Sequence, residues 1–249
     1  MPAGGRWWRV RRMGEMQVML TRRNLLTGMA VAPLVGAPGF RSAFASGTVS
    51  ETSPDVAMAK LIAGNARHAK GEYSADNGNL LRDRMSGFAD GQDPHSVIVA
   101  CSDSRVVPEL IFDAPPGDLF VMRVAGNVVS PFVIGSAEYA VLALKVRLVV
   151  IMGHSGCGAI SAAVQEIEKG EVSSGSLQQL VDQFLPAVVR VRRDKPKNLV
   201  QAAVEENTRI GIDRMSASMP TLAPLVTSGV LKVVAAVYDL SSGKVNFIG

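Results

Sequence analysis

The chain of 249 residues has few aromatic side chains, 5 % of the total, and only two cysteines. The shortage of aromatics, beside many Val, Ala and Leu residues, favours a parallel sheet packed under helices over an all-β sandwich. The apolar segment from Leu25 to Val35 contains Gly28 and Pro33 and is too short to anchor the chain in a bilayer. We therefore expect an α/β protein with no stable membrane anchor, long enough for one sizeable domain or two small ones.

The body of the chain lacks an excess of positive charge. Residues 1–45 hold seven arginines and one glutamate, whereas residues 46–249 hold 19 basic and 21 acidic side chains. The high sequence pI, about 9.3, therefore reflects the N-terminal segment. A basic surface for DNA or RNA would have to be local, and no run of residues 46–249 supplies one. We expect no nucleic-acid partner.

The N-terminal segment has the features of an export signal. Thr21-Arg-Arg-Asn-Leu-Leu26 resembles the twin-arginine motif, and Ala43-Phe-Ala45 fits a cleavage site behind the apolar segment. The alternative is a poorly ordered basic terminus. We expect residues 1–45 to be a signal that is cleaved near Ala45, which places the mature protein in the periplasm. Residues 46–53 are then a flexible linker and residues 54–249 a single domain.

Strands alternate with helices in the mature region, which predicts a mainly parallel sheet flanked by helices, with an antiparallel C-terminal hairpin at its edge. The predicted helices cover residues 54–64 or 54–68, 107–112, 135–145, 158–169, 177–193 and 198–219. The predicted strands cover residues 97–100, 119–124, 148–152 and 230–240, and residues 245–248 complete the hairpin.

Two predicted strands end on side chains that bind metals. Cys101 follows the first strand, and the loop after the third strand holds His154 and Cys157. Two thiolates and an imidazole suit zinc, and three protein ligands leave a fourth position for water, as in a catalytic site. Bound zinc lowers the pKa of that water from ~15.7 towards ~7. A disulfide is the competing use of two cysteines in an exported protein. The twin-arginine route, however, carries proteins that are already folded with their metal.

Asp103 and Arg105 add charges that a metal cage does not need. Asp103 could accept a hydrogen bond from the metal-bound water, or it could occupy the fourth position itself. The planar guanidinium of Arg105 is the natural partner to hold that carboxylate away from the metal. The pair therefore predicts a gate on the water.

Other readings of these residues are weaker. A lone cysteine on a strand is most often a small core residue. The glycine-rich loop 153–158 joins strand to helix as a phosphate loop does, but it lacks the Lys-Ser/Thr ending. We expect His68 and His95 to be ordinary surface or packing residues.

From about Leu61 to Ile248 the chain resembles the β-class carbonic anhydrases. The motifs stand in family order: Gly91-Gln-x-Pro94, Cys101-Ser-Asp-Ser-Arg-Val106, Pro108-Glu109, Gly117-Asp-Leu-Phe120, Arg123-x-Ala-Gly-Asn127, Glu138-Tyr139 and Gly153-His-Ser-x-Cys-Gly158. The resemblance implies that Cys101, His154 and Cys157 bind one zinc ion per subunit. It also implies that Asp103 and Arg105 form the dyad that gates the metal-bound water.

The same resemblance assigns the substrate residues and the assembly. Gln92 matches a glutamine that hydrogen-bonds bicarbonate across a subunit contact, and Phe120 and Tyr139 match residues that line the apolar CO2 pocket. Gly158 falls where a backbone amide faces the site. The family forms dimers or dimers of dimers, so we expect a homodimer or homotetramer.

One departure from the family bears on regulation. Some members bind bicarbonate at an inhibitory site with a Trp three residues before the first zinc cysteine. That position is Ile98 in this chain, although Arg123 matches another part of the site. We therefore expect an open site, in which Asp103 pairs with Arg105 near neutral pH.

The function implied is the reversible hydration of CO2 to bicarbonate and a proton by attack of zinc-bound hydroxide. A hydrolase of CS2 or COS on the same scaffold would keep every residue named, so only comparative kinetics separates the two. A non-catalytic, zinc-stabilised interaction protein and a disulfide redox protein are alternatives from other classes.

Overall fold

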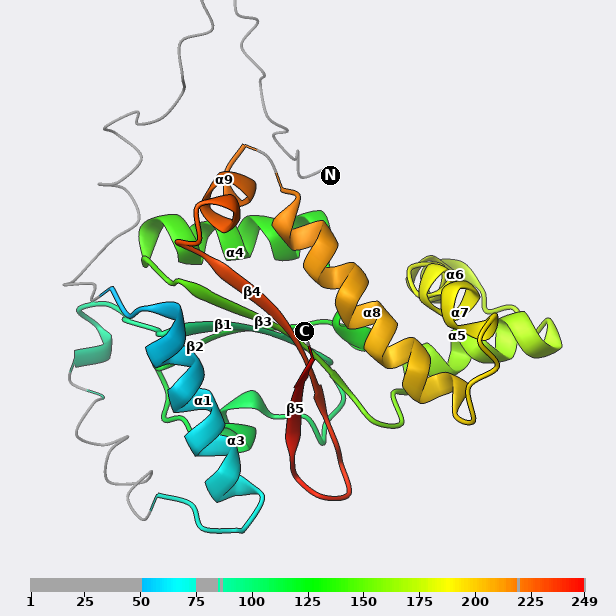
Figure 1. Ribbon diagram of the computed structural model, residues 1–249, viewed down its shortest axis with the longest axis horizontal. Helices are drawn as coiled ribbons and strands as arrows, with labels where there is room; N and C mark the ends of the chain where they lie inside the picture. Colours follow the sequence, from blue (N-terminus) through cyan, green and yellow to red (C-terminus); the bar gives the residue numbers. More distant parts are fainter. Residues whose placement is uncertain (1–50, 75–84, 86, 219, 249) are drawn as a thin grey trace, which may run out of the picture. The chain divides into compact units, whose positions relative to one another are not determined.

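The structure is a computed structural model that describes residues 51–74, 85, 87–218 and 220–248. The predicted export signal and residues 46–50 of the predicted linker lie outside the described residues. A five-stranded sheet in the order β2-β1-β3-β4-β5 forms the centre of the fold (Figure 1). All neighbouring strands are parallel except the last pair, β4 and β5, which is antiparallel as predicted. The strands are β1 Ser96–Ala100, β2 Leu119–Arg123, β3 Leu148–His154, β4 Lys232–Tyr238 and β5 Val245–Ile248.

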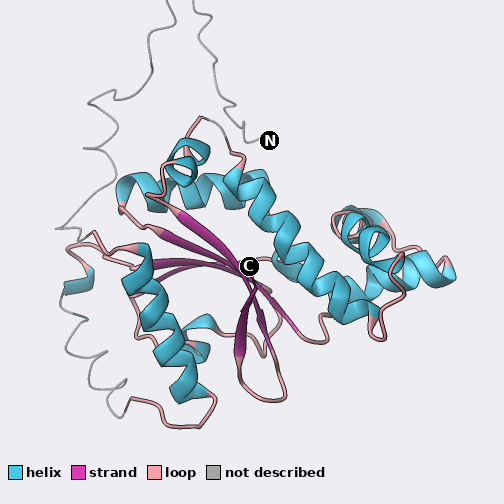
Figure 2. Cartoon of the chain, in the orientation of Figure 1, coloured by secondary structure: helices cyan, strands magenta, loops and turns pink. Residues whose placement is uncertain are grey.

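Helices cover both faces of the sheet, which is why its central strands are almost continuously apolar (Figure 2). Strand β1 is buried over its whole length. Its side chains alternate between the two faces: Val97 and Val99 pack under α4, α8 and α9, and Ile98 and Ala100 under α1 and α3. These helices are α1 Pro54–His68, α3 Pro108–Ile111, α4 Pro131–Ala143, α8 Leu199–Ser216 and α9 Leu222–Thr227.

A third apolar cluster lies beyond the carboxyl ends of the strands. It joins α8 to three further helices and includes both cysteine side chains. Those helices, which lie beside α8 in Figure 1, are α5 Gly158–Lys169, α6 Gly175–Val181 and α7 Leu185–Arg192. None of the helices in the described residues is long and apolar enough to cross a membrane.

Three predicted elements differ from the structure. The helix expected over 135–145 begins at Pro131, because Ser130 caps it by accepting a hydrogen bond from the Val133 amide at 3.4 Å. Strand β3 continues to His154, so this ligand belongs to the sheet itself. The helix expected over 177–193 is two helices, α6 and α7. The ring of Pro186, in the first turn of α7, cannot continue a preceding helix.

Helix α1 runs to His68 and does not stop at Gly64 and Asn65, because both residues are used for packing. A Cβ atom at Gly64 would overlap the backbone carbonyl of Phe112. The Asn65 amide donates to the carbonyls of Ile111 at 3.1 Å and Gly243 at 2.9 Å. Its oxygen accepts from the Val245 amide at 2.8 Å. One side chain thus joins α1 to α3 and to the C-terminal hairpin.

Replacing Asn65 by alanine should lower the free energy of unfolding by about 3 kcal/mol, because one buried and two partly buried hydrogen bonds to backbone groups are lost. Urea denaturation followed by circular dichroism measures the loss. The matched control is Ala66→Asn, which places the same side chain on the exposed side of α1 and should change stability by less than about 0.5 kcal/mol. Equal losses in the two variants would contradict this account of Asn65.

Candidate metal centre

Cys101, His154 and Cys157 meet in the structure. Cys101 follows the last residue of β1, His154 ends the neighbouring strand β3, and Cys157 caps the N-terminus of α5. Gly156, with φ of 64°, provides the turn between the last two. The ligand atoms of all three residues lie within 4.8 Å of one another, and all three residues are buried. The predicted ligand set is therefore assembled within one chain.

His154 presents one nitrogen to this site. Its Nδ1 lies 3.0 Å from the carbonyl oxygen of Ser155, so it carries the proton and donates it there. The Nε2 atom then carries a lone pair, is fully buried and has no hydrogen-bond partner within the described residues. The nearest carboxylate oxygen, on Asp103, is 3.9 Å away. A buried acceptor without a partner is unfavourable, and a metal ion would satisfy it.

The two cysteines form a thiol–thiolate pair. They are free, so the Cys101–Cys157 disulfide of the redox alternative is not formed. A hydrogen bond from the Cys157 thiol lowers the pKa of Cys101 to about 4, and sharing the proton in this way raises the pKa of Cys157. The Cys101 sulfur also accepts from the backbone amides of Gly126 at 3.2 Å and Asp103 at 3.4 Å. A thiolate beside an imidazole is a donor set for a soft or borderline cation such as zinc.

Gly126 is a residue whose role the sequence did not reveal. It lies in the short 3₁₀ helix Ala125–Asn127, with φ of 63°. A Cβ atom here would collide with the ring of Phe184. The amide of Asn207, on α8, donates to the Gly126 carbonyl at 3.0 Å. Phe184 and Asn207 thus fix the position of Gly126, the residue whose amide donates to the Cys101 sulfur. The only sequence signal was an Ala-Gly-Asn run that ends β2.

Asp103 and Arg105 form a two-pronged ion pair beside the ligands. Arg105 donates from Nε to Oδ1 at 2.9 Å and from Nη2 to Oδ2 at 2.7 Å, and its backbone amide also reaches Oδ1 at 3.0 Å. These bonds hold the pKa of Asp103 well below the usual range for a carboxyl group, so it stays ionised. The predicted partnership of these two residues is present, with the carboxylate facing the guanidinium.

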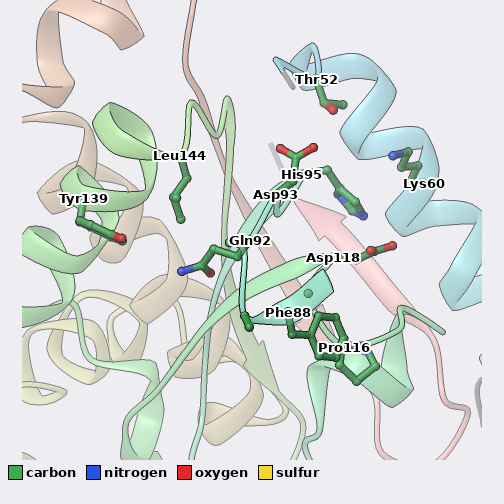
Figure 3. Close-up of a pocket in the computed structure, with 13 residues that line it drawn as sticks. Thr52, Lys60, Phe88, Gln92, Asp93, His95, Pro116, Asp118, Tyr139 and Leu144 are labelled. Carbon is green, nitrogen blue, oxygen red and sulfur yellow. The ribbon is translucent and has the colours of Figure 1, made fainter. Parts of the chain in front are cut away.

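The residues expected to bind substrate divide between two ends of the sheet. Gly158 follows Cys157 directly and begins α5 at the metal ligands. Gln92 and Tyr139 instead line a cavity of about 760 Å³ (Figure 3). The ring of Phe120 packs against that of Tyr139, with 6.0 Å between ring centroids and 42° between the ring planes. This cavity adjoins the amino end of β1, roughly 17 Å along the strand from Cys101. Within one chain, Gln92, Phe120 and Tyr139 therefore lie far from the metal ligands.

The other two histidines have partners away from the site, as expected of packing residues. His68 lies between the hydroxyl groups of Tyr73, at 2.8 Å, and Tyr238, at 3.0 Å. His95 pairs with the hydroxyl of Ser96 at 2.8 Å. His154 is therefore the one histidine of the chain placed to bind the metal.

Comparison with known proteins gives a consistent family. The family model "Carbonic anhydrase" matches residues 96–245. "Carbonic anhydrase 2" of Mycobacterium tuberculosis is 37 % identical over 196 residues, which cover 78 % of this chain and 92 % of the relative. The carbonic anhydrase of Synechococcus elongatus is 34 % identical over 205 residues, covering 76 % of this chain and 70 % of the relative.

Solved structures agree with these relatives. A structure from the work on two tetrameric β-carbonic anhydrases of Sordaria macrospora has a TM-score of 0.61 at 27 % identity, and the match covers 75 % of this chain and 95 % of that one. The Coccomyxa β-carbonic anhydrase in complex with acetazolamide gives 0.58 at 25 %, covering 70 % and 87 %. With its mixed five-stranded sheet and its Cys-His-Cys cluster, the chain belongs to the carbonic anhydrase family, in the β class.

Proposed function

We propose that this chain catalyses the reversible hydration of CO2 to bicarbonate and a proton as a zinc enzyme. The observation that carries the proposal is the buried Nε2 of His154, which has no hydrogen-bond partner in the described residues, on a ring that offers a ligand nitrogen within 4.8 Å of both cysteine sulfurs. Its Nδ1–H is already committed to a backbone carbonyl, which fixes the tautomer that binds metal. Cys101, His154 and Cys157 would hold the ion. When bound, zinc acidifies a water molecule and so supplies a nucleophile near neutral pH.

The role proposed for Asp103 is to orient the attacking water. Its two oxygens accept three hydrogen bonds from Arg105, and an ionised carboxylate has room for about four. The remaining lone pair is available to the water, and Arg105 prevents the carboxylate from turning towards the metal. Because Asp103 remains ionised, it accepts this hydrogen bond and does not donate one. The dyad thus keeps the water in one orientation without competing for the metal.

Zinc content and CO2 hydration together test this assignment. His154→Ala should lose both zinc and activity, whereas Asp103→Asn should keep zinc and lose about 100-fold in kcat, because the amide replaces one acceptor oxygen by an N–H donor and removes the charge that pairs with Arg105. Plasma emission spectroscopy measures the metal, and stopped-flow hydration measures the rate.

His68→Ala is the control, since the ring nitrogens of His68 lie on the hydroxyls of Tyr73 and Tyr238, away from the metal ligands, and the variant should retain both properties. The proposed metal role fails if His154→Ala binds zinc as wild type does. The proposed gate fails if a crystal structure of the zinc-loaded protein at about pH 8 shows an Asp103 oxygen on the metal.

We further propose that a second copy of the chain completes the substrate pocket. Tyr139 and the exposed side chain of Phe132 lie two turns apart on α4, hence on one side of that helix. Phe132 is 88 % exposed, an unusual state for a large apolar residue. A partner covering this side of α4 reaches the cavity that Gln92 and Tyr139 line. In a two-fold pair, the substrate residues of each chain then face the metal ligands of the other.

Subunit complementation tests the shared pocket. His154→Ala and Gln92→Ala chains should each be nearly inactive as homodimers, because one lacks the metal and the other the substrate contact. Co-expressed, half of the dimers are mixed and contain one intact site of two, so about a quarter of wild-type activity should return. Stopped-flow hydration on the co-expressed mixture measures this, and mixed dimers purified through a different tag on each chain should show about half of wild-type activity. Mixed dimers that stay as inactive as the parents would contradict a site shared between chains.

We also propose that the mature protein acts after export by the twin-arginine route, on the sequence motif described above. Replacing Arg22 and Arg23 by lysine should leave the precursor inside the cell, whereas the wild-type exported form should begin near Ser46. Fractionation and N-terminal sequencing measure both outcomes. Arg11 and Arg12, an arginine pair outside the motif, give the matched lysine control, which should still be exported. Normal export of the Arg22/Arg23 variant would refute the route.

A further inference from the structure

Arg123 reaches the metal loop from the neighbouring strand. It is the last residue of β2 and pairs in register with Ala100, the residue before Cys101. Its Nε donates to the carbonyl oxygen of Cys101 at 3.1 Å, and its Nη2 donates to the carbonyl oxygen of Asp103 at 2.7 Å. Within the described part of the chain, its guanidinium bonds these two carbonyls and no carboxylate. The planar guanidinium of Arg123 therefore spans the segment from Cys101, a proposed metal ligand, to Asp103.

The two carbonyls that Arg123 bonds differ in their other partners. The Asp103 carbonyl also accepts the Val106 amide at 2.9 Å, so Arg123 adds a second bond to a peptide that is already in a turn. Without Arg123, by contrast, the Cys101 carbonyl would lose the hydrogen bond that it accepts from the Arg123 Nε atom.

We propose that Arg123 is a positioning residue that locks the loop 101–105 in its metal-binding form; the inference rests on the proposed zinc site. By fixing the carbonyls on both sides of Ser102, it sets the distance between the Cys101 sulfur and the Asp103 carboxylate. The lock slows the release of metal, since any backbone movement that carries Cys101 away from the ion breaks the bonds to Arg123. It also keeps the Asp103 carboxylate on Arg105.

Zinc release measures the lock directly. In the zinc-loaded protein, Arg123→Gln should transfer zinc to a chromophoric chelator about 10- to 100-fold faster than wild type, the usual effect of losing a group that orients a metal ligand. Cobalt-loaded Arg123→Gln should also show a changed visible absorption spectrum, because the geometry of the thiolate ligand changes. A purely structural role elsewhere in the fold would not alter that spectrum.

Arg147 offers a matched control at the opposite end of the sheet. It precedes β3, and its Nη1 donates to the carbonyls of Val141 at 3.1 Å and Val146 at 3.5 Å, while its Nε bonds Glu51. Arg147→Gln thus removes an arginine that also bridges two carbonyls, without touching the metal loop. It should lower the thermal midpoint at least as much as Arg123→Gln and leave the zinc-release rate and cobalt spectrum unchanged.

Arg123→Lys keeps the positive charge of the side chain but removes the planar guanidinium that bonds both carbonyls. A single ammonium cannot bond both carbonyls in the geometry of the guanidinium, so zinc should still leave about tenfold faster than from wild type. This variant also carries the test if Arg123→Gln does not fold. Wild-type release rates in Arg123→Lys, or equally fast release from Arg147→Gln, would overturn the lock. If the wild-type chain binds zinc and hydrates CO2 while Arg123→Gln releases zinc normally, the lock alone is wrong. A wild-type chain without stoichiometric zinc would refute the proposed function as well.

Discussion

The parallel pairing of β1 with β3 is the constraint on which the metal centre depends. Register places Ala100 opposite Met152, so Cys101 and His154 emerge from adjacent strands at the same edge of the sheet. That pairing forms only because both faces of the two strands are buried beneath helices, since a central parallel strand must be covered on both sides. The helices that bury the apolar strands therefore also stabilise the strand pairing that brings the sulfur and nitrogen ligands together.

Hydrogen bonds then determine the chemical state of Cys101 and His154, because burial alone would raise the pKa of a thiol. Backbone amides of Gly126 and Asp103 point at the Cys101 sulfur, and the Ser155 carbonyl takes the proton of His154 Nδ1. These bonds stabilise a thiolate and expose a lone pair, the forms that bind a cation. They are all made to the backbone, so side-chain substitutions nearby leave them in place unless they move the loop. A site built this way depends on loop conformation more than on the polar side chains around it.

The sequence predicted the parts of the molecule that local patterns encode. Apolar runs located β1 and β3, and the residue types at their ends located the ligands, because strand ends are visible in sequence. Helix α4 begins earlier than predicted because Ser130 caps it and Pro131 fits its first turn. The roles of Gly126 and Arg123 could not be predicted, because each depends on contacts between residues more than 20 positions apart. Local signals cannot specify which distant peptide an exposed arginine will bond.

The separation of Gln92, Phe120 and Tyr139 from the metal ligands follows from the same parallel sheet. Gln92 precedes β1, and Phe120, the second residue of β2, contacts Tyr139 of α4, so all three lie towards the amino edge. The ligands at the ends of β1 and β3, by contrast, lie at the carboxyl edge. Strands of this length hold the two edges apart, and no loop movement within one chain closes such a gap. A two-fold axis can bring opposite edges of two copies together, which is the physical basis of the proposed shared pocket. The topology that creates the metal centre thus keeps Gln92, Phe120 and Tyr139 away from the metal ligands of the same chain.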